Sequence, residues 1–457
     1  MVYFFFLGWS ANGVSVCCLG FFLCPLLFAE HFLTRSISVK IIIGFITFLS
    51  CHLLAGRNLI TNIEPSFEIF LQLVNSCVLT IPWIAYVLVK RKLTPIFSIL
   101  FLITAWLTSE QLSLVASIPN PWFVLGNGFC SHPELIQFYE YSGVAGGSLW
   151  ILLSNSSFFI GMVIGSAQSY SILKFAGLFS FITVLNMVPL FLSIDSKVNF
   201  HGRTEEVLIL NTYKSDRDVL GVSLYELVKE TRDNISVNTK YIVWPENLFA
   251  SVIRDDEIEN SRLVGLIRKH LMMGEGPKVV CGAILSRNDE FYNCALMITS
   301  TCLSVYKKKK LVPFTETSPA LFKPFNLFKL SNIEFTTGPK KVAASSISVN
   351  ICYELLFGNL VSQNCYESGG QVLASISNEY WIEGASELLV GIGSIRAIEN
   401  RKFLIRSINN GIATLINPNG EVLQHFRSKK AISSIKGHVI PNNYQTFYMR
   451  KIGRAHV

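Results

Sequence analysis

The sequence predicts two parts of different kinds, a multi-span α-helical membrane domain followed by a polar α/β domain. Half of the 457 residues are hydrophobic and only 15% are charged, a composition typical of a membrane protein. Residues 1–194 hold seven Lys or Arg and six Asp or Glu, so most of the net charge of +8 follows residue 194. From residue 206 onward, short β-type runs alternate with helical ones, which indicates an α/β domain.

The first part contains six apolar stretches that can each cross a bilayer. A spanning helix needs about 20 apolar residues, and every stretch has about 18 or more. The first stretch lacks the basic flank and the small-residue cleavage site of a signal peptide, so we interpret it as a span. The stretches are residues 2–29, 38–56, 67–89, 94–118, 141–165 and 171–194.

Basic loops predict how these spans are oriented. Lys90, Arg91 and Lys92 form the strongest basic cluster, and Arg35 and Lys40 form a second cluster two spans earlier. Both clusters are expected in the cytoplasm, because short loops rich in Lys and Arg are retained there. The polar domain that follows the sixth stretch is then expected on the extracytoplasmic face.

The polar domain begins after a linker at residues 195–203. Runs rich in Val and Ile predict strands, longer amphipathic runs predict helices, and Pro418-Asn419-Gly420 predicts a hairpin turn. The predicted strands are 207–210, 241–244, 278–285 and 347–351, and the predicted helices are 220–231 and 258–273.

One thiol lies at the junction between a predicted strand and a predicted helix. Residues 347–351 alternate like a strand, and a helix is expected from Glu354, so Cys352 falls between them. Free N–H groups at a helix start carry partial positive charge, and we expect them to lower the pKa of this thiol. A cysteine in an apolar run is more often a packed core residue, so this position needs further support.

Three segments supply that support. Residues 243–246 read Val-Trp-Pro-Glu, residues 306–316 read Tyr-Lys-Lys-Lys-Lys-Leu-Val-Pro-Phe-Thr-Glu, and residues 352–354 read Cys-Tyr-Glu. In this order they resemble the Glu-Lys-Cys set of the nitrilase, or carbon-nitrogen hydrolase, superfamily. The Leu-Val-Pro-Phe-x-Glu segment and the membrane part narrow the resemblance to the apolipoprotein N-acyltransferase family. The resemblance covers nearly the whole chain and implies an extracytoplasmic, nitrilase-like four-layer αββα sandwich.

The resemblance implies a role for each residue of this set. Glu246 would be the general base, Lys308 would stabilise the oxyanion, and Cys352 would be the nucleophile. A neutral thiol needs a base, and a tetrahedral intermediate needs a fixed positive charge, so these residue types suit the chemistry. Glu316 and Glu354 match glutamates that support the triad in the family.

The lysine and the substrate contacts are less sharply defined. The Tyr-x-Lys-x-x-Leu spacing selects Lys308, but Lys310 shares its strand face and stays the alternative. Tyr353 and Trp381 are expected to bind substrate. Glu379 stands where the family has Asp. The sequence also departs from the family pattern at Thr315, where Gly is usual, at Ile382, where Phe is usual, and at 386–391, which lack the usual Gln-His. Two other segments, 396–401 and 406–411, fit the pattern closely and are expected to form structural ion pairs and a turn.

The resemblance implies an acyl transfer. An acyl chain would pass from a membrane phospholipid, through a thioester on Cys352, to the N-terminal amine of an S-diacylglyceryl-cysteine lipoprotein at the periplasmic face of the bacterial inner (cytoplasmic) membrane. No cofactor is implied, and no metal-ligand spacing or nucleic-acid motif is present in the sequence. The alternatives are a membrane-tethered nitrilase-type amidase and an inactive homologue that acts as a membrane scaffold.

The predicted domains are a membrane part at 1–195, a catalytic part at 205–440 and an approach to a further span at 441–457. The family typically has seven spans before its catalytic domain, so we expect a missing or misplaced start. Residues 451–457 resemble a translated adapter read-through, and we expect a truncated chain. Aromatic residues and lysines interleave from residue 320 to 330, which favours an arm that dips into the headgroup layer.

Overall fold

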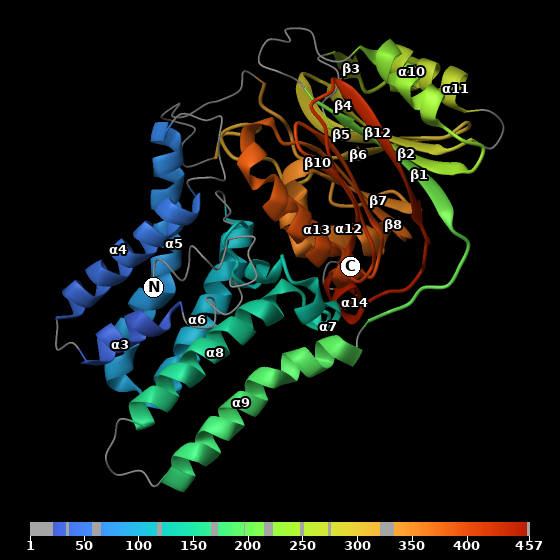
Figure 1. The fold of residues 1–457 in the computed structure, drawn as a ribbon. Coiled ribbons are helices and arrows are strands. Elements are labelled where there is room, and N and C mark those ends of the chain that lie inside the picture. The colour runs from blue at the N-terminus through green and yellow to red at the C-terminus, as the bar shows by residue number, and fades with distance from the viewer. Residues whose placement is uncertain are drawn as a thin grey trace. The chain divides into compact units, whose positions relative to one another are not determined.

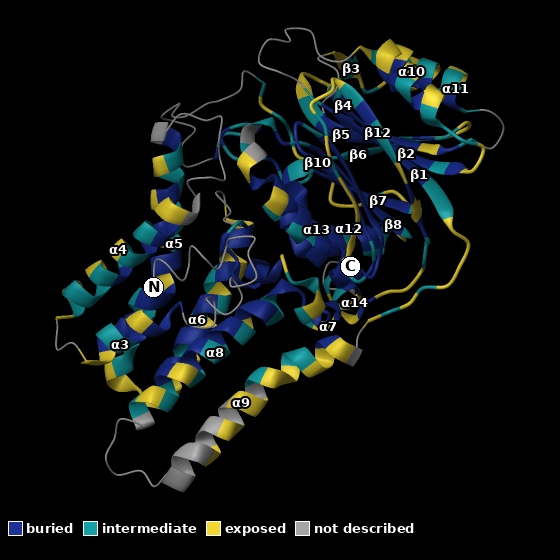
Figure 2. Cartoon of the chain, in the orientation of Figure 1, coloured by how far each residue is buried: buried dark blue, intermediate teal, exposed yellow. Residues whose placement is uncertain are grey.

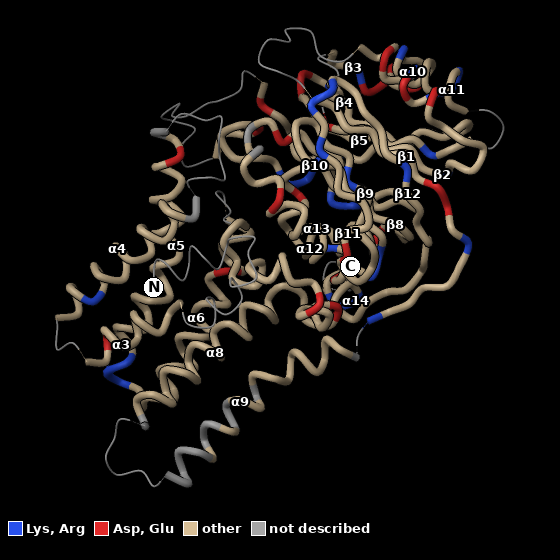
Figure 3. The backbone as a smooth tube through the Cα atoms, viewed as in Figure 1, with Lys and Arg blue, Asp and Glu red and all other residues tan. Residues whose placement is uncertain are grey.

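A computed structural model of the chain divides it into two compact units, Met1–Lys197 and Val198–Val457 (Figure 1). Charged residues are more frequent along the second unit than along the first, as the sequence predicts (Figure 3). The side chains of a few residues inside described helices, Trp381 among them, are not described. The structure describes residues 22–32, 36–56, 65–116, 121–165, 172–195, 197–213, 223–246, 251–272, 276–319 and 333–454.

The first unit is helical and contains four helices that are long and apolar enough to cross a membrane, counted over the described residues. They coincide with four of the six predicted stretches, and the stretch at 171–194 forms a further helix. The stretch at 2–29 lies mostly outside the described residues. The helices are α3 (Cys24–Phe32), α4 (Ile37–Gly56), α5 (Pro65–Val89), α6 (Pro95–Val115), α7 (Tyr139–Ser142), α8 (Val144–Gly165) and α9 (Ile172–Asp195), and the four candidate spans lie in α4, α5, α6 and α8.

One buried carboxylate organises the turn between α6 and α8. Glu110 of α6 is 6% exposed, and its Oε1 accepts hydrogen bonds from the Leu125 N–H at 3.0 Å and from Trp106 Nε1 at 3.2 Å. Leu125 begins a 3₁₀ turn, η2 (Leu125–Phe129). Because backbone N–H groups in an apolar layer need a partner, Glu110 fixes the start of this turn.

The second unit is built on two β-sheets. In the first sheet, the strand order is β12-β1-β2-β4-β5-β6, with β3 also beside β4; in the second it is β7-β8-β9-β10-β11. One residue pair, Thr212 with Asn409, links β1 to β9. The strands are β1 (Glu205–Thr212), β2 (Thr239–Val243), β3 (Val252–Arg254), β4 (Lys278–Arg287), β5 (Glu290–Ile298), β6 (Leu303–Lys307), β7 (Ile347–Ile351), β8 (Val372–Asn378), β9 (Leu404–Asn409), β10 (Ile412–Ile416), β11 (Val422–Arg427) and β12 (Ile432–Val439).

The two sheets pack face to face, and helices cover their outer faces, which gives the expected αββα sandwich (Figures 1 and 2). Neighbouring residues of β1 point to opposite faces. Ile209 joins the core between the sheets, and Leu208 joins the core beneath the helices. Helices α10 (Leu224–Asn234) and α11 (Arg262–Leu271) cover the first sheet, and α12 (Gly358–Ser368) and α13 (Ser386–Asn400) cover the second.

The structure confirms several predicted elements and corrects others. Strand β7 has the predicted bounds, and the hairpin turn lies between β10 and β11, with Gly420 at a φ of 80°. The predicted helix directly after Cys352 is wrong, because a 3₁₀ turn, η6 (Cys352–Leu356), precedes α12. The helix predicted from 258 begins later, at Arg262, because Ser261 caps it by accepting from the Val264 N–H. The arm predicted at 320–330 lies outside the described residues.

Candidate active site

Cys352 lies at a sharp turn where β7 ends. Its φ is 50°, in the left-handed region that residues other than glycine seldom adopt and that is often found at functional sites. Its Sγ lies 3.9 Å from the carbonyl oxygen of Asn378, within reach of a thiol donor. Asn378 is the last residue of β8, which runs beside β7, so the two strand ends bring these groups together.

The ammonium group of Lys308 is buried between two carboxylates. Lys308 directly follows β6, and its Nζ lies 2.9 Å from Glu316 Oε1 and 3.3 Å from Glu246 Oε1. Burial alone would lower the pKa of Lys308, but the facing carboxylates outweigh this effect and raise its pKa above the ordinary value. The lysine is therefore charged throughout the physiological range.

An asparagine that the sequence motifs did not indicate joins the same cluster. Nδ2 of Asn293, on β5, donates to Glu246 Oε1 and to Glu316 Oε1, both at 2.7 Å. Its backbone oxygen accepts from the Lys308 N–H at 2.8 Å. The only signal in the sequence is one amide residue in the otherwise apolar run from 291 to 298, and such a residue can equally pair with the backbone.

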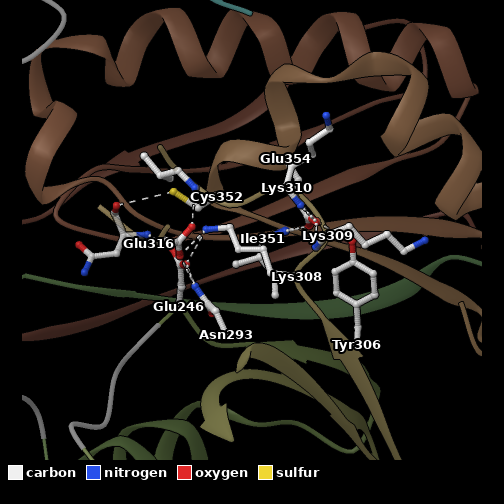
Figure 4. Close-up of polar contacts among 12 residues, drawn as sticks. Glu246, Asn293, Tyr306, Lys308, Lys309, Lys310, Glu316, Ile351, Cys352 and Glu354 are labelled. Carbon is white, nitrogen blue, oxygen red and sulfur yellow. Dashed lines mark hydrogen bonds and ion pairs between the residues drawn. The ribbon is translucent and has the colours of Figure 1, made fainter. Parts of the chain in front are cut away.

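Glu246 reaches the thiol side of the cluster as well as the lysine. It lies just beyond β2, is 2% exposed, and accepts through Oε2 from the Asn378 N–H at 2.9 Å. The same residue, Asn378, thus contacts both the carboxylate and the thiol. Figure 4 shows the sulfur of Cys352 beside the carboxylates of Glu246 and Glu316.

The electrostatic environment of Cys352 differs from the one that the sequence predicts. Burial, followed by the negative charge of Glu246, raises the pKa of the thiol to about 12, and Lys308 offsets only part of this. The prediction of a lowered pKa is wrong, because burial and the charge of Glu246 disfavour the thiolate, and because Cys352 opens a 3₁₀ turn in place of the expected α-helix. The thiol rests in its neutral form, so a base must remove its proton during reaction.

Glu354 connects the turn that begins at Cys352 to the loop that contains Lys308. It is fully buried and accepts from the Ile351 N–H at 2.8 Å, the Lys309 N–H at 2.7 Å and the Tyr306 hydroxyl at 2.8 Å. It also accepts from the Lys310 N–H at 3.3 Å. The carboxylate therefore ties β6 and its following loop to the end of β7 (Figure 4).

Two further predicted residues, Lys310 and Tyr353, both contact the ring of Phe357. The ammonium of Lys310 lies over the Phe357 ring, 5.0 Å from its centroid, so the geometry places Lys308 and not Lys310 between the carboxylates. Tyr353 is 8% exposed, with its ring against Phe357 at 5.1 Å. The side chain of Trp381 is outside the described part of the chain.

This arrangement combines a thiol, a carboxylate and a fixed ammonium group. The carboxylate can take the thiol proton, the sulfur can attack a carbonyl carbon, and the ammonium can stabilise the resulting oxyanion. The chemistry that fits is transfer of an acyl group through a thioester. Among the described residues, no group of three or more His, Cys, Asp or Glu side chains is placed to hold a metal ion.

Family models match both units of the chain. The model described as the apolipoprotein N-acyltransferase N-terminal domain matches residues 4–157, and the one described as carbon-nitrogen hydrolase matches residues 209–435. The second match contains the whole cluster around Lys308 and Cys352.

Curated relatives match at low identity over long stretches. The apolipoprotein N-acyltransferase of Wigglesworthia glossinidia brevipalpis is 26% identical over 400 residues, which cover 82% of this chain and 76% of the relative. That of Rickettsia prowazekii is 27% identical and covers 77% of this chain and 71% of the relative. Among solved structures, a carbon-nitrogen hydrolase superfamily protein of Xanthomonas campestris aligns with a TM-score of 0.39 and 14% identity, over 51% of this chain and 91% of that one.

Proposed function

We propose that this chain, which belongs to the apolipoprotein N-acyltransferase family, moves an acyl chain from a membrane phospholipid to the N-terminal amine of a diacylglyceryl lipoprotein. The observation that carries the proposal is the buried Lys308 ammonium, held between Glu246 and Glu316 beside the Cys352 thiol. The same chain has helices that are long and apolar enough to span a bilayer, which favours a substrate held in the membrane.

The first half-reaction loads the thiol. Glu246 takes the proton of Cys352 as Sγ attacks the ester carbonyl carbon of the phospholipid, and a C–S bond forms. The negative charge on the carbonyl oxygen is stabilised by the Lys308 ammonium. The ester C–O bond then breaks, and the leaving alkoxide takes the proton from Glu246 and departs as a lysophospholipid.

The second half-reaction transfers the acyl group from the Cys352 thioester to the lipoprotein. The neutral α-amine of the lipoprotein attacks the thioester carbonyl carbon, a C–N bond forms, and Glu246 takes a proton from the attacking nitrogen. The same ammonium stabilises the second oxyanion. The C–S bond breaks, and the Cys352 sulfur recovers its proton from Glu246. The neutral resting thiol is restored for the next cycle.

The site is proposed to lie on the periplasmic face of the bacterial inner membrane. The basic cluster at 90–92 and the pair Arg35 and Lys40 are separated by two spans, and short basic loops stay in the cytoplasm. Both substrates are lipids or carry lipids, so a site at the outer leaflet meets them without extracting them from the bilayer.

The experiment is an acyl-enzyme assay with the full chain in phospholipid vesicles. Phospholipid with a labelled acyl chain is expected to label wild-type Cys352, and a diacylglyceryl lipopeptide is then expected to remove the label as an N-acyl product. Cys352→Ser is the matched control, because it replaces only the sulfur atom by the less nucleophilic oxygen and keeps the rest of the side chain. Absence of label on the wild-type chain would refute the proposed transferase activity.

The same assay separates the two alternatives. A nitrilase-type amidase that acts on small amides takes no label from phospholipid, but it hydrolyses a small amide at the same rate with or without the lipopeptide, because water is its acceptor. An inactive scaffold forms no acyl-enzyme. Restoration of lipoprotein N-acylation in a depleted bacterial host, lost with Cys352→Ser, would exclude both.

A further inference from the structure

A second buried ion pair lies within electrostatic range of the thiol. Nη2 of Arg406, on β9, lies 2.6 Å from Oε1 of Glu379, and both side chains are at most 1% exposed. Each charge depends on the other, because an ion buried without its partner carries a large desolvation penalty. Arg406 lies on β9 beside β8, and the last residue of β8, Asn378, directs its carbonyl oxygen toward the Cys352 sulfur. A negative charge on that sulfur would also stabilise the Arg406 cation.

The backbone connects this pair directly to the reacting groups. Glu379 follows Asn378, and its N–H donates to the Asn409 carbonyl at 2.8 Å. On the same peptide group, the Asn378 carbonyl faces Cys352 Sγ at 3.9 Å. The N–H of Asn378 donates to Glu246 Oε2 at 2.9 Å. Movement of Glu379 would therefore displace a backbone segment that contacts both the thiol and the carboxylate.

The Glu379 side chain occupies a space that a neighbouring glycine leaves open. A Cβ atom placed on Gly411 would lie 2.3 Å from Glu379 Oε2, closer than any allowed contact. The glycine therefore leaves the room that the Glu379 carboxylate occupies.

We propose that Glu379 and Arg406 are positioning residues for Cys352. Their ion pair fixes the Asn378–Glu379 peptide group against the Cys352 sulfur. The positive charge of Arg406 and the negative charge of Glu379 offset each other, so neither charge acts alone on the thiol. This role in acyl transfer rests on the proposed function, but the coupling between the pair and the thiol does not.

The thiol is surrounded by charged groups from several elements, and the pair acts in addition to them. Four of these groups are close enough to influence its ionisation. They are Glu246 after β2, Lys308 after β6, Glu316 in the next loop and Arg406 on β9, with Glu379 as the counter-charge of Arg406.

The test measures alkylation of Cys352 by iodoacetamide at about pH 8, with the full chain in detergent and the Cys352 peptide quantified by mass spectrometry. Well below its pKa, a thiol reacts in proportion to its thiolate fraction, which changes tenfold for each unit of pKa. Glu379→Gln leaves Arg406 uncompensated and is expected to raise the rate about tenfold. Arg406→Gln leaves Glu379 uncompensated and is expected to lower it about tenfold.

Changes of the alkylation rate in opposite directions in the two variants distinguish this role from a merely structural one. General loosening would raise the rate in both variants by exposing the thiol. Equal rates, or changes in the same direction, would overturn the proposal. Glu399→Gln is the matched control, because it breaks another fully buried pair, Arg396 with Glu399 at 2.8 Å, on α13 over the same sheet. Its rate is expected to stay within about twofold of wild type, and a change like that of Glu379→Gln would also overturn the proposal.

A double variant, Glu379→Gln with Arg406→Gln, covers the case in which a lone buried charge prevents folding. It is expected to keep the alkylation rate within about threefold of wild type and to lower kcat of acyl transfer about tenfold at unchanged KM. Wild-type kcat in this variant would overturn the proposal. A wild-type chain that alkylates as expected but transfers no acyl group would refute the proposed function instead, so the two failures are distinguishable.

Discussion

The ammonium nitrogen of Lys308 lies 2.9 Å from Oε1 of Glu316, closer than to any oxygen of the carboxylate assigned as base. Glu316 is itself held by the Val312 N–H at 2.8 Å. Because Glu316 binds the lysine at short range, Glu246 can exchange a proton without releasing the ammonium. We therefore propose that Glu316 holds the lysine and that Glu246 moves the proton.

Lys308→Met should abolish acyl transfer. We expect a loss of at least about a hundredfold in kcat, because the oxyanion loses its fixed positive charge. Initial rates with labelled phospholipid measure the effect. Lys310→Met is the matched control and should stay within about threefold of wild type, because its ammonium lies over Phe357 and not between the carboxylates. Equal losses in the two variants would contradict the assignment of Lys308.

Glu246→Gln should change two assays in opposite directions. Acyl transfer is expected to fall at least about a hundredfold, because no base takes the thiol proton. Alkylation of Cys352 is expected to become faster, because the charge of Glu246 raises the pKa of the thiol and its removal lowers that pKa. Slower alkylation together with lost transfer would indicate a collapsed site and would contradict the role as base.

The pH dependence of thiol reactivity follows from the same environment. Since burial and Glu246 raise the pKa of Cys352 to about 12, the thiolate fraction should rise tenfold for each pH unit well below that value. The alkylation rate of the wild-type chain should therefore increase without a plateau between about pH 7 and pH 10. A plateau near neutral pH would show a thiol already ionised at rest.

Tyr306→Phe should reduce stability less than Glu354→Leu does. Tyr306→Phe removes one of the four donors to Glu354 and should reduce stability by about 1 kcal/mol, with activity retained. Glu354→Leu leaves the Ile351 and Lys309 N–H groups without their acceptor and should cost about 3 kcal/mol or more, with activity lost. Thermal unfolding in detergent measures both. A reversed order would contradict the bracing role of Glu354.

In the membrane unit, Glu110→Leu should destabilise the turn that follows α6. The Leu125 N–H and the Trp106 indole N–H would lose their shared acceptor, at about 1–3 kcal/mol for each group. Gln111→Leu is the matched control, because the neighbouring side chain is exposed on the same helix. A smaller heat-stability loss for Glu110→Leu than for the control would contradict the anchoring role.

Much of the fold was predictable, because the hydrophobic pattern reports burial directly. The long apolar runs gave α4, α5, α6 and α8, and the alternation at 347–351 gave β7 with its bounds. The helix after Cys352 was not predictable, since an apolar run does not distinguish a 3₁₀ turn from the first turn of an α-helix. The pKa of the thiol was mispredicted because the burial of Cys352 and the nearby charge of Glu246 depend on the tertiary structure.

Hydropathy and motif spacing are properties of the chain alone, so they were enough to predict the two-part organisation and the residue types that gather at the site. Three contacts could be identified only in the folded chain: Lys308 between the two carboxylates, the bridge from Asn293 to both acids, and the ion pair of Glu379 with Arg406. These contacts join strands that are far apart in sequence, and a pairing between distant side chains depends on how the two sheets align.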